Sequence, residues 1–294
     1  MSERKVAFVT GASRGIGRAC AISLAQAGYD VAVSARTLTD GSARLDDGVT
    51  PVPGGLDTTV EKIIKAGQEG LAIEMDLMDR KSVLNAADTA YDHFGRIDVL
   101  LNNAGLGVYG AIEDVSMEDI YYQYDVNLFG LARVTKAVLP YMREKESGLI
   151  INISSVLGET YGPLAGWYLS TKHALEGWSD ALRVELKEFD IDVVVVQPGA
   201  INTNFSNVTK TYIDKYRENS AYQHLYGEPI TDTGNDVLSN QSDPIVIAKV
   251  INKAMNARNP KTRYAAGAYS KIGIFLRKIM TDKMFDRFIL FISD

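Results

Sequence analysis

Seven short apolar runs rich in Val and Ile recur along the chain, separated by stretches with helical, amphipathic spacing. The runs occupy residues 5–9, 30–35, 71–75, 97–102, 148–153, 191–196 and 262–266. Parallel strands that helices cover on both faces are nearly continuous hydrophobic segments, as Asp192–Val196 (DVVVV) is. The pattern predicts an α/β fold: one doubly wound, seven-stranded parallel sheet flanked by helices.

The length of 294 residues is compatible with one or two domains. Because the predicted sheet spans most of the chain, we expect one domain over residues 1–266 and a C-terminal amphipathic helical extension over 267–294. Two stretches interrupt the alternation. Residues 38–56 are rich in Gly, Pro and Asp and predict a long surface loop, which indicates either function or disorder. Residues 198–243 follow the sixth strand and are expected to cover a substrate at the carboxyl ends of the strands.

Composition excludes several classes of function. The chain has 31 Lys and Arg against 37 Asp and Glu, a net charge of −6, which argues against a nucleic-acid partner. A single cysteine excludes an internal disulfide, and the three histidines have no metal-ligand spacing, so we expect no metal. No segment resembles a signal peptide or the ~20 apolar residues of a membrane span. We therefore expect a cytoplasmic protein.

A glycine-rich segment joins the first strand to the first helix. Its residues Gly11, Ser13, Arg14, Gly15, Ile16 and Gly17 are candidate cofactor-binding residues. Glycines let the backbone approach a pyrophosphate closely, and the N–H groups at the start of the helix favour its negative charge. A plain strand-to-helix turn is the alternative interpretation. The position between the first strand and helix favours a nucleotide in a Rossmann-type fold.

The second strand ends without the acidic residue that NAD-preferring proteins usually carry there. Arg36 follows that strand instead, and Arg14 lies in the glycine-rich segment. The two cations together favour the 2′-phosphate of NADP(H) over NAD, whereas the alternative is two solvated surface arginines. Asp76, followed by Leu77, ends the third strand and is a candidate acceptor for the adenine amino group. A helix N-cap is an equally good use of Asp76.

Tyr168 and Lys172 lie four residues apart in a predicted helix, so both side chains project from one face. A nearby ammonium lowers the pKa of a phenol and makes it a usable general acid or base. The fifth strand brings Ser154 and Ser155 to its carboxyl end, where a hydroxyl can polarise a carbonyl. Cys20 lies on an apolar helical face and is predicted to be buried and inert.

These features together resemble the short-chain dehydrogenase/reductase family, in the subgroup with a T-G-x-x-x-G-x-G cofactor loop and a Y-x-x-x-K active site. The matching motifs are Thr10–Gly17, Asn102–Gly105, Asn127, Ser154–Gly158, Tyr168–Lys172, and Pro198-Gly199 followed by Thr203. They occur in the family's order, and the resemblance covers roughly residues 4–266.

The resemblance implies a catalytic role for four residues. Tyr168 would donate the proton in reduction, Lys172 would lower the pKa of Tyr168 and bind the nicotinamide ribose, and Ser155 would hold the substrate oxygen. Asn127 would anchor a water chain that connects Lys172 to solvent. Ser155 is preferred to Ser154 because the family's serine lies thirteen residues before the tyrosine.

The same resemblance implies further contacts to the cofactor. Asn103, Ala104 and Gly105 would lie against its adenosine half, while Ile201 and Thr203, after Pro198 and Gly199, would hold the carboxamide. Hydride passes directly between nicotinamide and substrate in this chemistry, so no metal is needed.

The residues expected around the site are mostly apolar or aromatic, which predicts an uncharged, hydrophobic alcohol or ketone as the substrate. We therefore predict an NADP(H)-dependent alcohol dehydrogenase or carbonyl reductase for steroid-like, retinoid-like, terpenoid or aryl compounds. The alternative is an NADP(H)-binding regulatory or scaffold protein without turnover. A dehydratase or epimerase is disfavoured by the glycine spacing.

The remaining expectations concern partners. Family members often pair through the helices at 116–145 and 167–189, which predicts a homodimer or homotetramer. From residue 261 onwards, apolar residues alternate with seven basic and three acidic ones. We interpret this tail as helices packed on their own domain or across a subunit interface. Peripheral contact with a membrane surface is the alternative.

Overall fold

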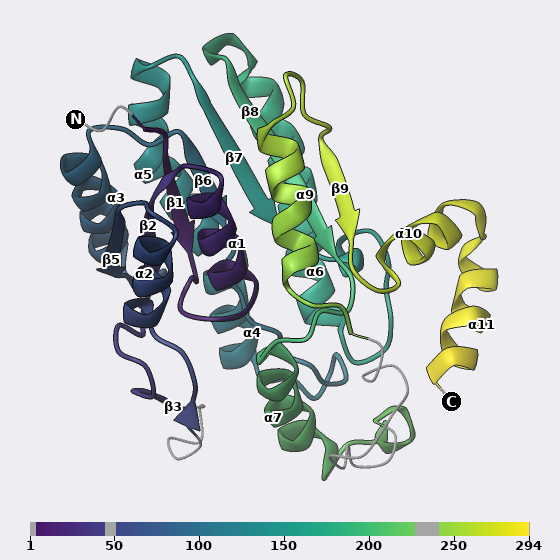
Figure 1. Cartoon of the computed structure of the whole chain (residues 1–294). Coiled ribbons are helices and arrows are strands. Elements are labelled where there is room, and N and C mark those ends of the chain that lie inside the picture. Colours follow the sequence, from purple (N-terminus) through teal and green to yellow (C-terminus); the bar gives the residue numbers. More distant parts are fainter. Residues whose placement is uncertain (1–3, 45–50, 227–240, 294) are drawn as a thin grey trace.

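The computed structural model describes residues 4–44, 51–226 and 241–293 (Figure 1). Seven strands form one sheet in the order β5-β2-β1-β6-β7-β8-β9, and every neighbouring pair is parallel. The strands are β1 (Val6–Thr10), β2 (Asp30–Ala35), β5 (Gly70–Glu74), β6 (Val99–Asn102), β7 (Gly148–Ile153), β8 (Ile191–Pro198) and β9 (Arg263–Ala266). Each apolar run of the sequence forms one of these strands, so the predicted sheet is confirmed.

Helices cover both faces of the sheet (Figure 1). One layer contains α1 (Gly15–Gln26), α2 (Leu56–Lys65) and α9 (Ile245–Met255), and the other contains α3 (Arg80–Phe94), α5 (Leu131–Glu144) and α6 (Gly166–Glu185). Each layer buries its own apolar cluster against the strands. The doubly wound, Rossmann-type architecture is therefore confirmed.

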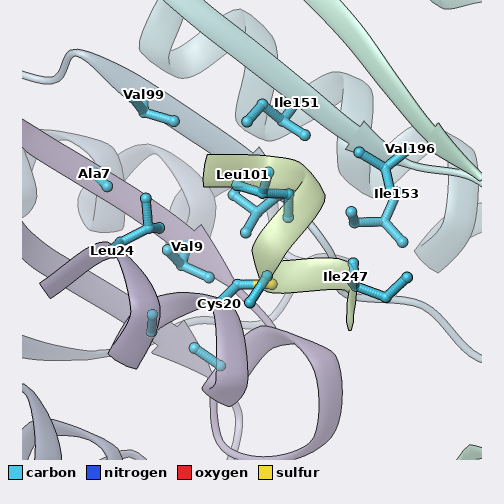
Figure 2. Close-up of a cluster of buried hydrophobic side chains, with 14 of the residues drawn as sticks. Ala7, Val9, Cys20, Leu24, Val99, Leu101, Ile151, Ile153, Val196 and Ile247 are labelled. Atoms are coloured by element: carbon cyan, nitrogen blue, oxygen red, sulfur yellow. The ribbon is translucent and has the colours of Figure 1, made fainter. Parts of the chain in front are cut away.

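Cys20 lies in the core on the α1 side of the sheet, in one buried apolar cluster with Val9, Leu101 and Ile247 (Figure 2). Its side chain is fully buried, and this burial raises the pKa of the thiol. A buried thiol in apolar surroundings is a poor nucleophile. Cys20 thus acts as a small core residue, as predicted.

The segment predicted as one helix over 116–145 is divided into three parts. It comprises α4 (Met117–Tyr124), a π-helical stretch η1 (Asp125–Gly130) and α5. A π-helix widens the turn by one residue, and such turns are often found at functional sites. Hydrophobic periodicity does not distinguish this widened turn from a regular helix, and η1 contains Asn127.

Both interruptions of the strand and helix alternation contain short elements. Within residues 38–56, β3 (Ala43–Arg44) pairs antiparallel with β4 (Pro51–Val52). The region 198–243 contains α7 (Phe205–Arg217) and η4 (Gln223–Leu225), while η2 (Val156–Gly158) and η3 (Lys187–Phe189) flank α6. The parts of these two regions at 45–50 and 227–240 lie outside the described residues.

The C-terminal segment forms two helices, α10 (Ser270–Ile279) and α11 (Asp282–Ser293), beyond the β9 edge of the sheet (Figure 1). The extension is helical as predicted, and its boundary as a separate unit at 267 stays a prediction. In the described part of the chain, no helix is sufficiently long and apolar to span a bilayer.

Candidate active site

Two neighbouring strand ends, those of β1 and β6, are joined by side-chain hydrogen bonds. The Thr10 hydroxyl accepts from the backbone N–H groups of Asn103 (3.0 Å) and Ala104 (3.2 Å). The Asn103 amide donates in turn to the carbonyl oxygens of Thr10 (3.0 Å) and Gly11 (3.1 Å). The predicted cofactor residues of the two strands therefore form one connected unit through Thr10, which the sequence analysis placed in the glycine-rich motif without giving it a role.

The glycine-rich segment has no room for side chains at two positions. Gly11 has φ +64°, and a Cβ there would lie 2.8 Å from the Ala104 Cα. A Cβ on Gly17 would lie 2.4 Å from the Gly11 carbonyl oxygen. Only glycine permits this tight turn, which brings the start of α1 against β6.

The N-terminus of α1 suits an anionic ligand. Arg14 occupies the N-cap position without a side-chain capping bond, and the first turn contains no acidic residue. The N–H groups of that turn and the helix dipole therefore favour a phosphate, and the Ser13, Gly15 and Ile16 backbone lies at the same place. This donor set fits the pyrophosphate of a dinucleotide.

Arg18, which the sequence analysis did not select, connects this turn to the end of the 38–56 loop. Its guanidinium donates to the Ser13 carbonyl (2.5 Å), the Gly55 carbonyl (3.1 Å) and the Thr58 hydroxyl (2.6 Å). A Cβ on Gly54 would lie 2.6 Å from the Ser13 oxygen, so the loop packs directly against the turn. Part of the loop thus supports the candidate cofactor site.

Arg14 and Arg36 lie close enough to repel each other. Burial, together with the charges of Arg18 and Arg36, lowers the pKa of Arg14. The Arg14 guanidinium also donates to the Thr37 hydroxyl (3.1 Å), immediately after Arg36. Both predicted cations therefore lie at the carboxyl end of β2, with no acidic side chain at the strand's last residue.

Asp76 lies at the carboxyl end of β5, where its carboxylate accepts from the Met78 N–H (2.9 Å). The N-cap of α3 is Asp79, whose side chain accepts from Lys81, so the alternative use of Asp76 as that cap is wrong. The next residue, Leu77, is buried, and its carbonyl accepts from Arg133 (3.0 Å). Contact of Asp76 with adenine stays a prediction.

The predicted catalytic residues converge at the carboxyl end of β7. Tyr168 and Lys172 are both buried on α6. The Lys172 ammonium lies 5.8 Å from the centroid of the Tyr168 ring and donates to the carbonyl of Ile153 (2.9 Å), the last residue of β7.

Ser155 follows Ile153 by two residues and hydrogen-bonds with Tyr168. Its hydroxyl also accepts from the Leu157 N–H (3.1 Å), whereas the Ser154 hydroxyl is buried without a partner among the described residues.

Burial controls the protonation of this pair. It raises the pKa of Tyr168 to about 12, although the hydrogen bond from Ser155 lowers it in part. Burial also lowers the pKa of Lys172 to about 8, and the nearby charge of Glu176 opposes that change. The resolved causes of the Tyr168 shift are burial and the Ser155 hydrogen bond, so the expected lowering of this pKa by Lys172 stays a prediction.

Asn127 is positioned by the π-helical turn. Its side-chain oxygen accepts from the Leu106 N–H (2.9 Å), and its amide donates to the Leu106 carbonyl (2.8 Å) and the Thr171 hydroxyl (3.2 Å). A Cβ on Gly105 would lie 3.2 Å from that oxygen and 3.7 Å from the Lys172 nitrogen. Asn127 and Gly105 thus lie beside Lys172, while a water chain stays a prediction. Thr171 was not anticipated from the sequence.

The segment after β8 approaches the glycine-rich turn. The Gly199 N–H donates to the Ala266 carbonyl (2.8 Å), which continues the pairing of β8 with β9 beyond Pro198. The Thr203 methyl group lies 3.4 Å from a Cβ built on Gly15, and Ile201 is buried. Thr203 is therefore adjacent to the glycine-rich turn, while its contact with the carboxamide stays a prediction.

Aromatic side chains surround Tyr168. The centroid of its ring lies 5.5 Å from that of Tyr109 and 5.6 Å from that of Phe205. Phe205 belongs to α7, within the region predicted to cover a substrate. Burial raises the pKa of the Tyr109 phenol well above its usual value, so Tyr109 stays neutral. Two aromatic rings therefore lie against the Tyr168 ring.

Among the described residues, no group of three or more His, Cys, Asp or Glu side chains is arranged to hold a metal ion. The polar groups at this site are instead a phenol, an amine, a hydroxyl and an amide. Such a set can hold a carbonyl or hydroxyl group and transfer a proton to or from its oxygen.

The model of the short chain dehydrogenase family matches residues 5–212. This range includes all the motifs named in the sequence analysis, and the C-terminal helices lie outside it. The chain belongs to the short-chain dehydrogenase/reductase family. The family assignment made from the motifs is therefore confirmed, and this short-chain dehydrogenase/reductase is an oxidoreductase, some of whose solved relatives hold NADP(H) or NAD.

Two curated relatives are similar over much of the chain. The uncharacterized oxidoreductase YusZ of Bacillus subtilis is 32% identical over 278 residues, covering 94% of each chain. A 3-ketodihydrosphingosine reductase of Bacteroides thetaiotaomicron is 35% identical over 205 residues, covering 69% of this chain and 66% of that protein.

Solved structures share the fold and differ in cofactor. A variant of actinorhodin polyketide ketoreductase with NADPH is 27% identical, with a TM-score of 0.74, covering 92% of this chain and 98% of that one. A short chain dehydrogenase from Mycobacterium paratuberculosis bound to NAD is 26% identical, with a TM-score of 0.71, covering 91% and 98%. The family therefore binds either cofactor.

Proposed function

We propose that this short-chain dehydrogenase/reductase transfers a hydride between NADP(H) and a hydrophobic secondary alcohol or ketone. The observation that carries the proposal is the convergence of Tyr168, Ser155 and Lys172 at the end of β7, beside the aromatic rings of Tyr109 and Phe205. Proton transfer to a carbonyl oxygen needs an acid that lies next to a group able to hold that oxygen, and this geometry supplies both.

The chain's own residues manage the oxygen and its proton. The Ser155 hydroxyl donates to the carbonyl oxygen and orients it toward Tyr168. Tyr168 then transfers its phenolic proton to that oxygen as the C–H bond forms, and the Lys172 ammonium stabilises the resulting phenolate. In the oxidative direction the phenolate removes the proton from the alcohol. The bound nicotinamide supplies or accepts the hydride at the carbonyl carbon.

The preference for NADP(H) is supported by the cationic end of β2. Arg14 and Arg36 lie together there, and two guanidinium groups can bind a 2′-phosphate with charge-assisted hydrogen bonds. NADPH is held by the polyketide ketoreductase, and NAD by the mycobacterial structure. The glycine-rich turn and Asn103–Gly105 would hold the shared adenosine and pyrophosphate part of either cofactor.

A hydrophobic substrate is supported by the rings around Tyr168 and by the apolar cluster next to them, which contains Val108, Val115 and Tyr212. One curated relative is named as a reductase of a 3-ketodihydrosphingosine and one solved relative as a polyketide ketoreductase. Both names denote ketones on extended carbon chains. Ketones attached to long or polycyclic apolar groups are therefore the first substrates to test.

The decisive experiment is a screen of ketones and secondary alcohols with NADPH and with NADH, followed by absorbance of the reduced nicotinamide. We expect turnover with apolar ketones and NADPH. Tyr168→Phe serves as the control, since it removes only the proton donor and should reduce turnover about 10²–10⁴-fold with cofactor binding retained. Cofactor binding without turnover of any compound would instead establish a binding protein.

We further propose that the protein is a homo-oligomer that assembles through α4 and α6. Large apolar side chains are exposed on these helices and on η1 between them, namely Met117, Tyr121, Phe129 and Val184. Large exposed apolar side chains on helices commonly mark subunit interfaces. Pairing of two copies through these helices would remove such side chains from water.

A further inference from the structure

The inner face of the C-terminal helices is firmly packed on the domain. Phe285 of α11 is 1% exposed, and its ring contacts that of Tyr161 edge to face at 4.9 Å. The Tyr161 hydroxyl donates to the Asp286 carboxylate (2.8 Å), while the Arg277 guanidinium lies over the Tyr161 ring at 5.2 Å. These contacts hold the two helices in a defined orientation, so their other faces are fixed toward the outside.

The outer face of α10 is apolar and exposed. Ile272, Phe275 and Ile279 are 58%, 59% and 60% exposed. Their spacing of three and four residues places them on one side of the helix, away from buried Ile274. Burying such residues in a nonpolar phase is favourable by roughly 25 cal/mol per Å² of apolar surface. In the described part of the chain, nothing covers this side of α10.

Helix α11 has the same character. Met284 and Phe291, seven residues apart and so on one side of the helix, are 52% and 80% exposed, and Leu290 is also exposed. Phe291 is the most exposed of the large apolar side chains among the described residues. The two helices together therefore present apolar residues that are not used in the packing against Tyr161.

Basic residues accompany these apolar faces. Lys271, Lys283 and Arg287 are exposed, and within the described ranges no ion pair involves them.

The other charged residues of the tail have partners. Arg277 pairs with Asp282 (2.9 Å) and Lys278 with Glu159 (3.3 Å), and the Asp286 carboxylate accepts a hydrogen bond from Tyr161. Residues 269–294 contain five basic and three acidic side chains, whereas the whole chain has a net charge of −6. The positive charge is thus concentrated where the apolar residues are exposed.

The exposed basic residues favour an anionic partner for the outer faces of α10 and α11. A two-fold contact between two copies of the tail would bring together two segments that each carry more basic than acidic residues. An anionic lipid surface attracts these residues, while its acyl region accepts Ile272, Phe275 and Phe291. We propose that the outer faces of α10 and α11 dock on the surface of a membrane that contains anionic lipids.

The test is flotation of the purified full-length protein with vesicles of phosphatidylcholine alone or of phosphatidylcholine mixed with phosphatidylglycerol. We expect binding to the anionic vesicles that weakens with added salt. Lys271→Gln/Lys283→Gln/Arg287→Gln should weaken it about tenfold or more. Phe275→Gln/Ile279→Gln should also weaken binding to the anionic vesicles, because it removes the apolar contact.

Ile64→Gln is the matched control, since Ile64 of α2 is 58% exposed, as Ile272 is, and lies outside the tail. This variant should float like the wild type. All the substitutions are on the surface, and unchanged melting temperature and cofactor binding verify the fold. Absence of wild-type binding to anionic vesicles would overturn the proposal. Equal binding of the tail variants would also overturn it, as would a tail-dependent change of molecular mass in solution without vesicle binding, which would establish a second copy as the partner.

Discussion

Tyr168 is a residue whose pKa depends clearly on its surroundings. Burial raises its pKa to about 12, so the phenol retains its proton at neutral pH. A general acid must carry its proton before the reaction starts, and Tyr168 meets this requirement. The sequence predicts the pairing with Lys172 from their spacing. It does not predict the desolvation that raises the pKa of Tyr168, because desolvation depends on what packs around the phenol.

The titration of Lys172 predicts in which direction turnover changes with pH. Burial lowers its pKa to about 8, so the ammonium is lost as the pH rises through about 8. Glu176, which is buried one turn later on α6, opposes this loss. We therefore predict that reductive turnover falls above about pH 8, and that Glu176→Gln moves the midpoint downward by up to about one pH unit. The pH profile of turnover is the measurement.

The control for this prediction is Asp180→Asn. Glu176 and Asp180 both accept hydrogen bonds from Arg263, at 2.9 Å and 2.7 Å. Of these two carboxylates, only Glu176 contributes to the pKa shift of Lys172. Asp180→Asn should therefore leave the midpoint in place. A midpoint that stays unchanged, or rises, in Glu176→Gln would show that Glu176 does not act on Lys172.

Arg36 is the residue at which the cofactor preference is tested. Removing an exposed guanidinium beside a 2′-phosphate deletes a charge-assisted hydrogen bond, which is worth about 1.5–3 kcal/mol. Arg36→Ala should weaken NADPH binding by about tenfold to a hundredfold and change NADH binding little. Titration calorimetry with both cofactors measures this, with exposed Arg258→Ala as the control. Equal losses for both cofactors would contradict the NADP(H) assignment.

At the scale of elements, the strands were predictable and the turns were not. Buried parallel strands have little choice but Val, Ile and Leu, so all seven are visible in the sequence. The π-helical turn around Asn127 is invisible, because its residues continue the pattern of the helices on either side. The catalytic residues were found through spaced motifs, whereas Arg18 and Thr171 were not, since their contacts join segments distant in sequence.

Phe285 is the most deeply buried of the described α11 side chains. Truncating a fully buried phenylalanine costs about 3–5 kcal/mol. Because α11 lies at the chain end, we expect Phe285→Ala to loosen this helix rather than unfold the domain. Amide hydrogen exchange of α11 should accelerate about a hundredfold or more, with the sheet amides unchanged. Leu290→Ala, an exposed position on the same helix, should change neither, and intact protection of α11 in Phe285→Ala would refute this view.

At the scale of the whole molecule, assembly is the property to test. Tyr121 on α4 and Val184 on α6 are mostly exposed, and neither lies in the catalytic group. Introducing charge at a buried interface is strongly unfavourable, so Tyr121→Asp/Val184→Asp should convert the oligomer to a smaller species. Light scattering coupled to gel filtration measures the mass, and Ile64→Asp is the control. A wild-type protein that is already monomeric would rule out this interface.

The contact between Tyr161 and Asp286 has a thermodynamic consequence. Tyr161 belongs to the segment between Ser155 and Tyr168, and the same contact anchors α11. Two events that act on a shared contact are linked, and linkage is reciprocal. If docking of the tail changes the affinity of the site for its ketone by some factor, the ketone changes the affinity of the tail for the lipid surface by the same factor. A hydrophobic substrate would then regulate where its own enzyme resides.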